Sequence, residues 1–161
     1  MLIEANPKNF EALQNNRPNA FNVHAAMCAG DYIDFIGTGA VGGVVDTMSK
    51  GHKKGWIKPN EKQLRVPCQT FKPLFSKYGI QHIDIFVLDV EGGEYQVLQT
   101  MDWSVTVSVW VVELDGSNPE KNAKVREELS KHGYMPAMWN IRDWCVKGGD
   151  CTANEVFVPQ G

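Results

Sequence analysis

Acidic side chains follow the ends of three predicted strands. They are Glu4 after Leu2-Ile3, Asp89 and Glu91 after the run 83–88, and Glu113 and Asp115 after the run 107–112. In open α/β sheets, ligands bind in the crevice outside the carboxyl ends of the strands, where such residues meet. A helix cap or a solvated turn explains one acid at such a place. Acids at the ends of three strands instead indicate a functional site.

The chemistry open to each carboxylate depends on its position. Glu4 ends a strand just before a helix, where a carboxylate can accept hydrogen bonds from both hydroxyls of a ribose. Asp89, Glu91 and Glu113 are candidate general bases, able to take a proton from a hydroxyl group. These residues together could bind a nucleoside and assist a reaction at a hydroxyl.

Two other assignments are weaker. His24 and His82 are less favoured as bases because neither follows a predicted strand at the crevice. The acids could also hold Mg²⁺ or Ca²⁺, since both cations prefer oxygen ligands. We favour a site without a metal.

The elements that carry these residues alternate between strand and helix. Asn6 and Pro7 predict a helix start after the first short strand, because Asn caps helices and Pro suits the first helical position. Asn118-Pro119 repeats the pattern. Further strands are predicted at residues 20–26, 31–36, 64–66, 134–141 and 155–158, and a helix at 70–78.

The apolar run 83–88 predicts a fully buried strand and the run 107–112 a buried strand, each followed by a helix. This alternation predicts a single α/β domain over residues 1–161, with a Rossmann-like, doubly wound, mainly parallel sheet covered on both faces. The last two predicted strands form an antiparallel pair at the sheet's C-terminal edge.

Composition excludes several classes. The chain has 161 residues and a net charge of -3, without the concentrated basic face that nucleic-acid binding requires. The apolar runs are too short to cross a bilayer. Four unevenly spaced cysteines form no CxxC pair, so reduced thiols are expected, although Cys145 and Cys151 could close a small loop. We therefore expect a cytoplasmic protein.

The chain resembles the FkbM-type methyltransferases. The resemblance rests on Glu4-Ala5-Asn6-Pro7, on the block from Ile83 to Glu94 with its Asp-x-Glu-Gly-x-Glu pattern, and on Val111-Val112-Glu113. It implies S-adenosylmethionine as cofactor and O-methylation of a small molecule or a glycan. The cofactor positions that it implies are Glu4, Asn6, Ala26, Met27 and Asp89, and the catalytic positions are Asp89, Glu91 and Glu113.

The chain departs from the family at its start. The family carries a central strand and a Gly-rich loop before the residues that correspond to Leu2-Ile3-Glu4, whereas here Met1 precedes them directly. Truncation, replacement of the strand by another chain, and loss of cofactor binding all remain open. An open slot in the sheet would leave unpaired backbone groups, which predicts self-association or strand exchange.

Two alternatives compete with this interpretation. Residues 37–42 match GxGxxG, which would suggest a dinucleotide-dependent oxidoreductase, but the pattern needs a following helix and a later acid at a strand end. The fold could instead serve as a non-catalytic module that binds a partner or glycan through aromatic residues. Those residues are Trp56, Tyr134, Trp139 and Trp144, for which ordinary packing is the favoured explanation.

Overall fold

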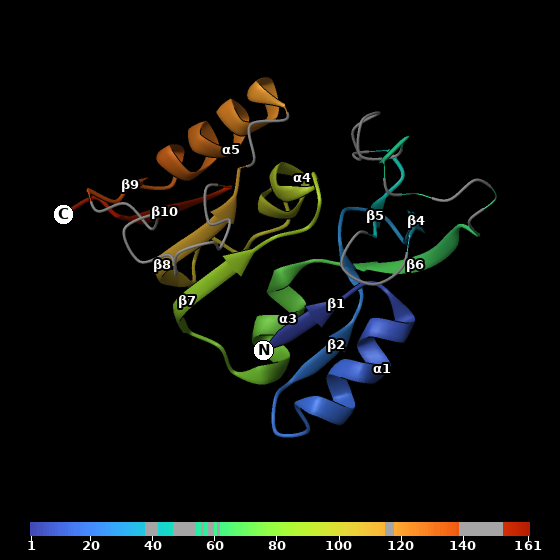
Figure 1. Ribbon diagram of the computed structural model, residues 1–161. Coiled ribbons are helices and arrows are strands. Elements are labelled where there is room, and N and C mark those ends of the chain that lie inside the picture. The colour runs from blue at the N-terminus through green and yellow to red at the C-terminus, as the bar shows by residue number, and fades with distance from the viewer. Residues whose placement is uncertain are drawn as a thin grey trace, which may run out of the picture.

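The computed structural model describes residues 1–37, 42–46, 54–55, 57, 60, 62–114, 118–138 and 153–161. Its helices are α1 (Pro7–Asn16), α3 (Phe71–Tyr78), α4 (Glu94–Leu98) and α5 (Pro119–Lys131) (Figure 1). Its strands are β1 (Leu2–Glu4), β2 (Asn22–His24), β3 (Ala26–Met27), β4 (Tyr32–Ile36), β5 (Gly43–Val44), β6 (Leu64–Gln69), β7 (His82–Leu88), β8 (Thr106–Glu113), β9 (Tyr134–Pro136) and β10 (Asn154–Pro159). The chain is a mixed α/β protein.

Both Asn-Pro pairs begin helices, as predicted. The Asn6 Oδ1 accepts the backbone N–H of Lys8 at 2.9 Å at the start of α1. Asn118 does the same for the backbone N–H of Lys121 at 3.1 Å at the start of α5. These side chains satisfy N–H groups that have no partner inside the helix.

The described strands form three separate sheets. β1 and β2 make a parallel pair, and β7 and β8 make another within the order β7-β8-β10-β9. In that sheet β10 is antiparallel to both neighbours, which confirms the predicted C-terminal antiparallel pair. The third sheet has the order β3-β6-β4-β5, with β3 and β6 parallel. A single doubly wound sheet therefore does not appear among the described strands.

The predicted strand at residues 20–26 is divided between two of these sheets. β2 pairs with β1, whereas β3 pairs with β6. Between them the N–H of Ala25 still donates to the Glu4 carbonyl at 3.2 Å. The chain thus passes from one sheet to the next at Ala25, close to the end of β1.

The main core lies where α3, α4 and α5 meet β7, β8 and β10. Its largest fully buried side chains include Phe71, Leu98, Trp110, Leu129 and Phe157. Phe86 stacks on Trp110 with 4.4 Å between ring centroids. None of the helices in the described ranges is long and apolar enough to span a membrane.

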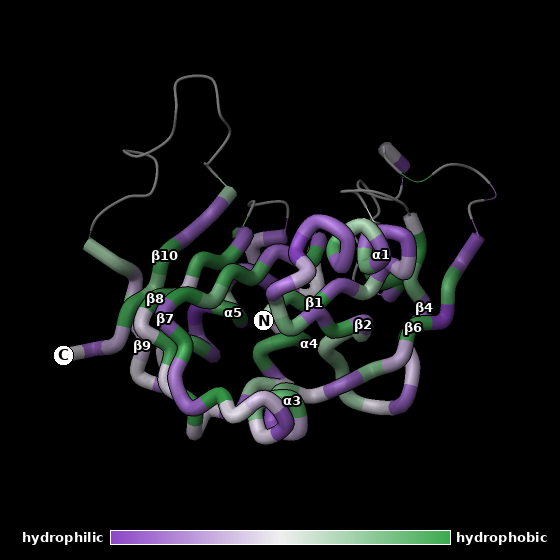
Figure 2. Tube along the Cα trace, turned by 90° about the horizontal axis from the view of Figure 1, so that it is seen from below, coloured by the Kyte–Doolittle hydropathy of each residue, from purple (hydrophilic) through white to green (hydrophobic). Residues whose placement is uncertain are grey.

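The prediction that residues 83–88 form a fully buried strand is wrong. Phe86 and Leu88 face the helices, but Ile85 and Val87 are 63% and 65% exposed. Side chains alternate between the faces of a strand, and no described helix covers the second face of β7. β7 is also the edge strand of its sheet. In both views β1 lies between β7 and β2, without hydrogen-bonded pairing to β7 (Figures 1 and 2).

The expectation of reduced thiols is wrong for Cys28 and Cys68, which form a disulfide with 5.1 Å between their Cα atoms. The pairing of β3 with β6 brings them together: Ala26 is in register with Cys68, and the Cys28 N–H donates to the Gln69 carbonyl at 3.1 Å. A sequence separation of 40 residues gave no sign of this contact. Cys145 and Cys151, which could close a small loop, lie outside the described residues.

Candidate functional site

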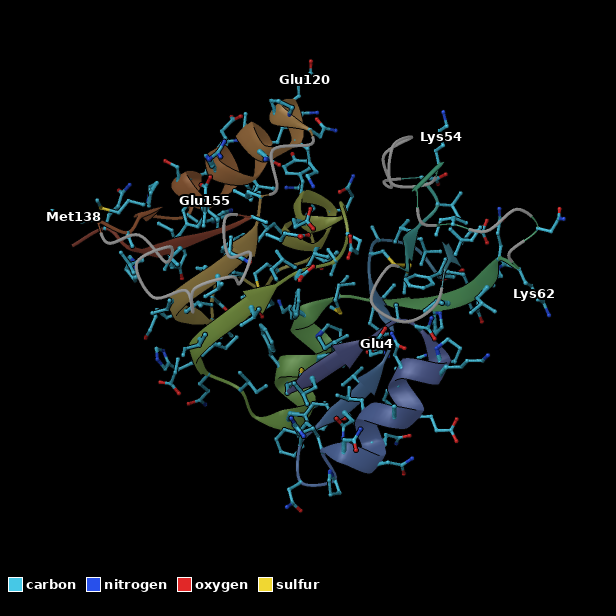
Figure 3. All side chains as sticks on the ribbon, viewed as in Figure 1. Glu4, Lys54, Lys62, Glu120, Met138 and Glu155 are labelled. Atoms are coloured by element: carbon cyan, nitrogen blue, oxygen red, sulfur yellow. A yellow bond between two sulfur atoms is a disulfide. The ribbon has the colours of Figure 1, made fainter. Side chains whose placement is uncertain are left out.

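A cavity of about 1410 Å³ lies along β1, β3 and β7. Its wall includes Glu4, Ala26, Met27, Asp89 and Glu91, five of the residues predicted from the sequence. Figure 3 labels Glu4 near the end of β1, toward the middle of the molecule. The cavity runs along the whole of β7, from His82 to Leu88, and the carboxyl ends of β1, β3 and β7 all border it. Acidic and apolar side chains share its wall.

Glu4 is held at one carboxylate oxygen. Its Oε1 accepts the backbone N–H of Asn6 at 2.7 Å, across the bend that leads into α1. The described residues supply no hydrogen-bond donor to Oε2. Because the side chain is half-buried on the cavity wall, this oxygen can accept a hydrogen bond from a ligand.

Asn6 has a different place. It is 1% exposed and is absent from the described lining of the cavity. Its Oδ1 caps α1, and its Nδ2 donates to the Gly37 carbonyl at 3.2 Å, just after β4. The side chain thus joins two elements beside the cavity, and a direct contact with a cofactor stays a prediction.

The turn from Asp89 to Gly93 carries two of the candidate bases in an unusual backbone conformation. Glu91 has a φ of 55° and Gly92 a φ of 108°. A non-glycine residue at positive φ costs of order 1 kcal/mol or more in folding free energy, so contacts around it must hold this backbone conformation. Such strain is concentrated at functional sites.

Glu94 supplies these contacts. It is completely buried, and its Oε1 accepts the N–H groups of Val90 at 3.3 Å and Gly92 at 3.1 Å. Its Oε2 accepts a hydrogen bond from the Lys121 Nζ at 2.8 Å. Sequence reasoning included Glu94 only as part of the motif and missed Lys121, which lies 27 residues away.

Glu113, at the end of β8, is half-buried and outside the described cavity lining. Burial raises its pKa to about 8, and the charges of Asp89, Glu91 and Glu94 act in the same direction, as does a hydrogen bond with Asp89. At neutral pH the Glu113 carboxyl is therefore mostly protonated and can donate this hydrogen bond to Asp89. In this protonation state the Glu113 carboxyl is a hydrogen-bond donor, and its role as a general base stays a prediction.

The two histidines have local partners. The His24 ring lies 3.1 Å from the Ala5 carbonyl and stacks on Phe10. His82 lies 3.1 Å from the Ser108 hydroxyl, at the start of β7 and hence at the opposite end of that strand from Asp89. In the described ranges no group of three or more His, Cys, Asp or Glu side chains is arranged to hold a metal ion.

The described residues bear on two points of the competing interpretations. β5 follows directly after Gly42 and pairs antiparallel with β4, where dinucleotide binding needs a helix. Tyr134 is buried, and its hydroxyl accepts the Val107 N–H at 3.0 Å, so it packs inside the protein. The other aromatic candidates (Trp56, Trp139 and Trp144), Asp115 and residues 38–41 lie outside the described residues.

Comparison with known proteins adds one finding. The family model described as Methyltransferase FkbM domain matches residues 1–136. No curated protein and no solved structure matches the chain. The match covers β1 and the turn after β7, and therefore the acidic part of the cavity.

Proposed function

Because the chain belongs to the FkbM methyltransferase domain family, as its resemblance predicted, we propose that it transfers a methyl group from S-adenosylmethionine to a hydroxyl of a small molecule or sugar. The observation that supports this most is the meeting of Glu4, Ala26, Met27, Asp89 and Glu91 on one cavity wall. A nucleoside needs hydrogen-bond acceptors for its ribose and an apolar surface for its base, and this wall offers both.

The side chains on the cavity wall match the groups of the cofactor. Glu4 Oε2 would accept hydrogen bonds from the ribose, while Oε1 stays tied to the Asn6 N–H. Ala26 and Met27 would form the surface beside the adenine. S-adenosylmethionine supplies an electrophilic methyl group on a sulfonium.

The acids after β7 would act on the acceptor. Asp89 or Glu91 would orient the acceptor hydroxyl and take its proton as the new carbon–oxygen bond forms. The bond between the methyl carbon and sulfur would break in the same step, with S-adenosylhomocysteine as the leaving group. The protonated Glu113 would donate a hydrogen bond to Asp89 and so fix the direction of that carboxylate. Proton removal therefore depends on residues from two neighbouring strands.

We also propose that the parallel pairs β1-β2 and β7-β8 are parts of one Rossmann-like arrangement in the form that binds ligand. Its support is the position of β1 between β2 and β7 in two views (Figures 1 and 2). The Cys28–Cys68 bond weighs against the cytoplasmic location expected from the sequence, because disulfides persist mainly in oxidising compartments.

The test is calorimetric titration with S-adenosylhomocysteine. Glu4→Gln keeps an oxygen that can accept the Asn6 N–H but loses the charge offered to a ribose. We expect its affinity to fall about 10-fold to 100-fold, the usual effect of losing a hydrogen bond to a charged group. Glu11→Gln, on the exposed side of α1, is the matched control and should bind like the parent.

A second candidate is a non-catalytic module of the same fold. The exposed side chains of Ile85 and Val87 favour it, because they leave one wall of the cavity open to solvent. A folded parent chain that shows no affinity for S-adenosylhomocysteine would support this candidate and reject the methyltransferase proposal.

A further inference from the structure

The buried ion pair between Glu94 and Lys121 joins α4 to α5 beneath the turn that carries Asp89 and Glu91. The Lys121 Nζ lies 2.8 Å from Glu94 Oε2, and the two side chains are 14% and 0% exposed. Such a pair is costly to bury, and removing one partner leaves an uncompensated charge inside the protein. Neither residue is needed to start its helix by capping, so the pair calls for another explanation.

The second oxygen of Glu94 provides it. Oε1 accepts the N–H groups of Val90 and Gly92, on the two sides of Glu91. Glu91 is the described non-glycine residue at positive φ in this turn. Glu94 therefore fixes the backbone on both sides of the strained residue, and its own position is fixed by Lys121.

Lys121 is itself held in place. Its backbone N–H donates to the Asn118 side chain, and this bond holds the Lys121 backbone in the first turn of α5. α5 packs against α4. The position of α5 therefore sets the position of the Lys121 ammonium group. The ammonium orients Glu94, and Glu94 holds the backbone from Val90 to Gly92.

We propose that Lys121 is a positioning residue for the site, holding the Asp89–Gly93 turn in its binding conformation through Glu94. The roles of Asp89 and Glu91 in this proposal rest on the proposed function. The effect of the ion pair on the conformation of the turn does not. Lys121 touches no cavity-lining acid directly in the described structure; it acts through Glu94.

The test compares Lys121→Met with the parent by amide hydrogen exchange. Met keeps much of the side-chain length but cannot donate to Glu94. We expect the Val90 and Gly92 amides to exchange about tenfold faster or more, as for the loss of a charge-assisted hydrogen bond, while amides of β8 change little. Affinity for S-adenosylhomocysteine should fall about tenfold as well.

Two further variants make the test specific. Lys121→Arg keeps the charge and should restore most of the protection at Val90 and Gly92. Lys124→Met is the matched control, because Lys124 lies one turn further along α5 and contacts α4 through the Tyr95 ring, 6.0 Å from its Nζ. It should leave exchange in the turn unchanged. If Lys121→Met fails to fold, Lys121→Gln takes its place, because its shorter, neutral side chain still removes the ion pair and leaves Glu94 at most a neutral donor.

Unchanged exchange at Val90 and Gly92 would overturn the proposal, and so would an equal increase at β8, which would mean a general loss of stability. A parent chain that does not bind S-adenosylhomocysteine would reject the proposed function alone, since the exchange measurements need no ligand.

Discussion

At the residue scale, the raised pKa of Glu113 makes stability depend on pH. The folded protein holds this proton up to a pH of about 8, whereas an unfolded Glu loses it near its ordinary value of 4.5. Between these values the folded state binds more protons, so stability falls as pH rises. The contribution of Glu113 is fully present below about pH 4.5 and is lost as pH rises through 8.

Glu113→Gln should remove this dependence, because an amide does not titrate. We expect the variant to be about 1 to 2 kcal/mol more stable than the parent at pH 8.5, after allowance for partial exposure, and to differ little at pH 5. Urea unfolding at the two pH values measures this. Glu120→Gln is the control, since Glu120 points away from the molecule at the start of α5 (Figure 3). A parallel pH dependence in parent and Glu113→Gln would contradict the assignment.

At the scale of single elements, the two helices that begin with Asn-Pro allow a direct comparison. Asn6→Ala should cost about 2 kcal/mol, because the cap of α1 and the buried bond to the Gly37 carbonyl are lost together. Asn118→Ala, at the exposed start of α5, should cost about 1 kcal/mol. Chemical denaturation of both variants makes the comparison. Equal losses would mean that the bond to Gly37 adds no stability.

Local chemistry made these helix starts predictable. An Asn-Pro pair can begin a helix by itself, because Asn accepts a backbone N–H of the first turn and Pro suits the first helical position. This does not depend on where the rest of the chain lies. The Gly-rich turn after residue 88 and the antiparallel C-terminal pair also follow from local pattern. For the site, the rule that ligands bind at the carboxyl ends of strands predicts that Glu4, Asp89 and Glu91 share a crevice, and all three line one cavity.

What the sequence could not supply depends on distant contacts. Glu94 and Lys121 are 27 residues apart in the sequence, and Cys28 and Cys68 are 40 apart. Their spacing along the sequence therefore does not predict either contact. The apolar run 83–88 predicted a strand that is buried on both faces. Hydrophobicity shows only that both faces could be buried, and it does not show whether another element packs against each face. Ile85 and Val87 are exposed for this reason.

At the scale of the whole molecule, the open side of β7 predicts self-association. An edge strand with exposed Ile85 and Val87 offers unpaired backbone groups beside apolar side chains, which favours pairing with another chain. We expect the parent to form dimers or larger species as concentration rises, and Ile85→Lys to shift the equilibrium several-fold toward monomer. Sedimentation velocity over a concentration series measures the shift.

Met138→Lys is the control for this experiment. Met138 is 98% exposed and lies far from β7, at the outer edge of the molecule (Figure 3). The same gain in charge there should leave the association unchanged. A parent that stays monomeric at every concentration, or an equal effect of both lysines, would remove β7 as the association surface.

The Cys28–Cys68 bond has a practical consequence for how the protein is prepared. Cys28 lies on the cavity wall, next to Ala26 and Met27. Material made in the reducing cytosol of an expression host would carry free thiols there and a loosened connection between β3 and β6. Oxidative refolding or export to the periplasm, checked by mass spectrometry of unreduced peptides, is therefore the first step. Only protein that passes this check can give a ligand titration that bears on the proposed function.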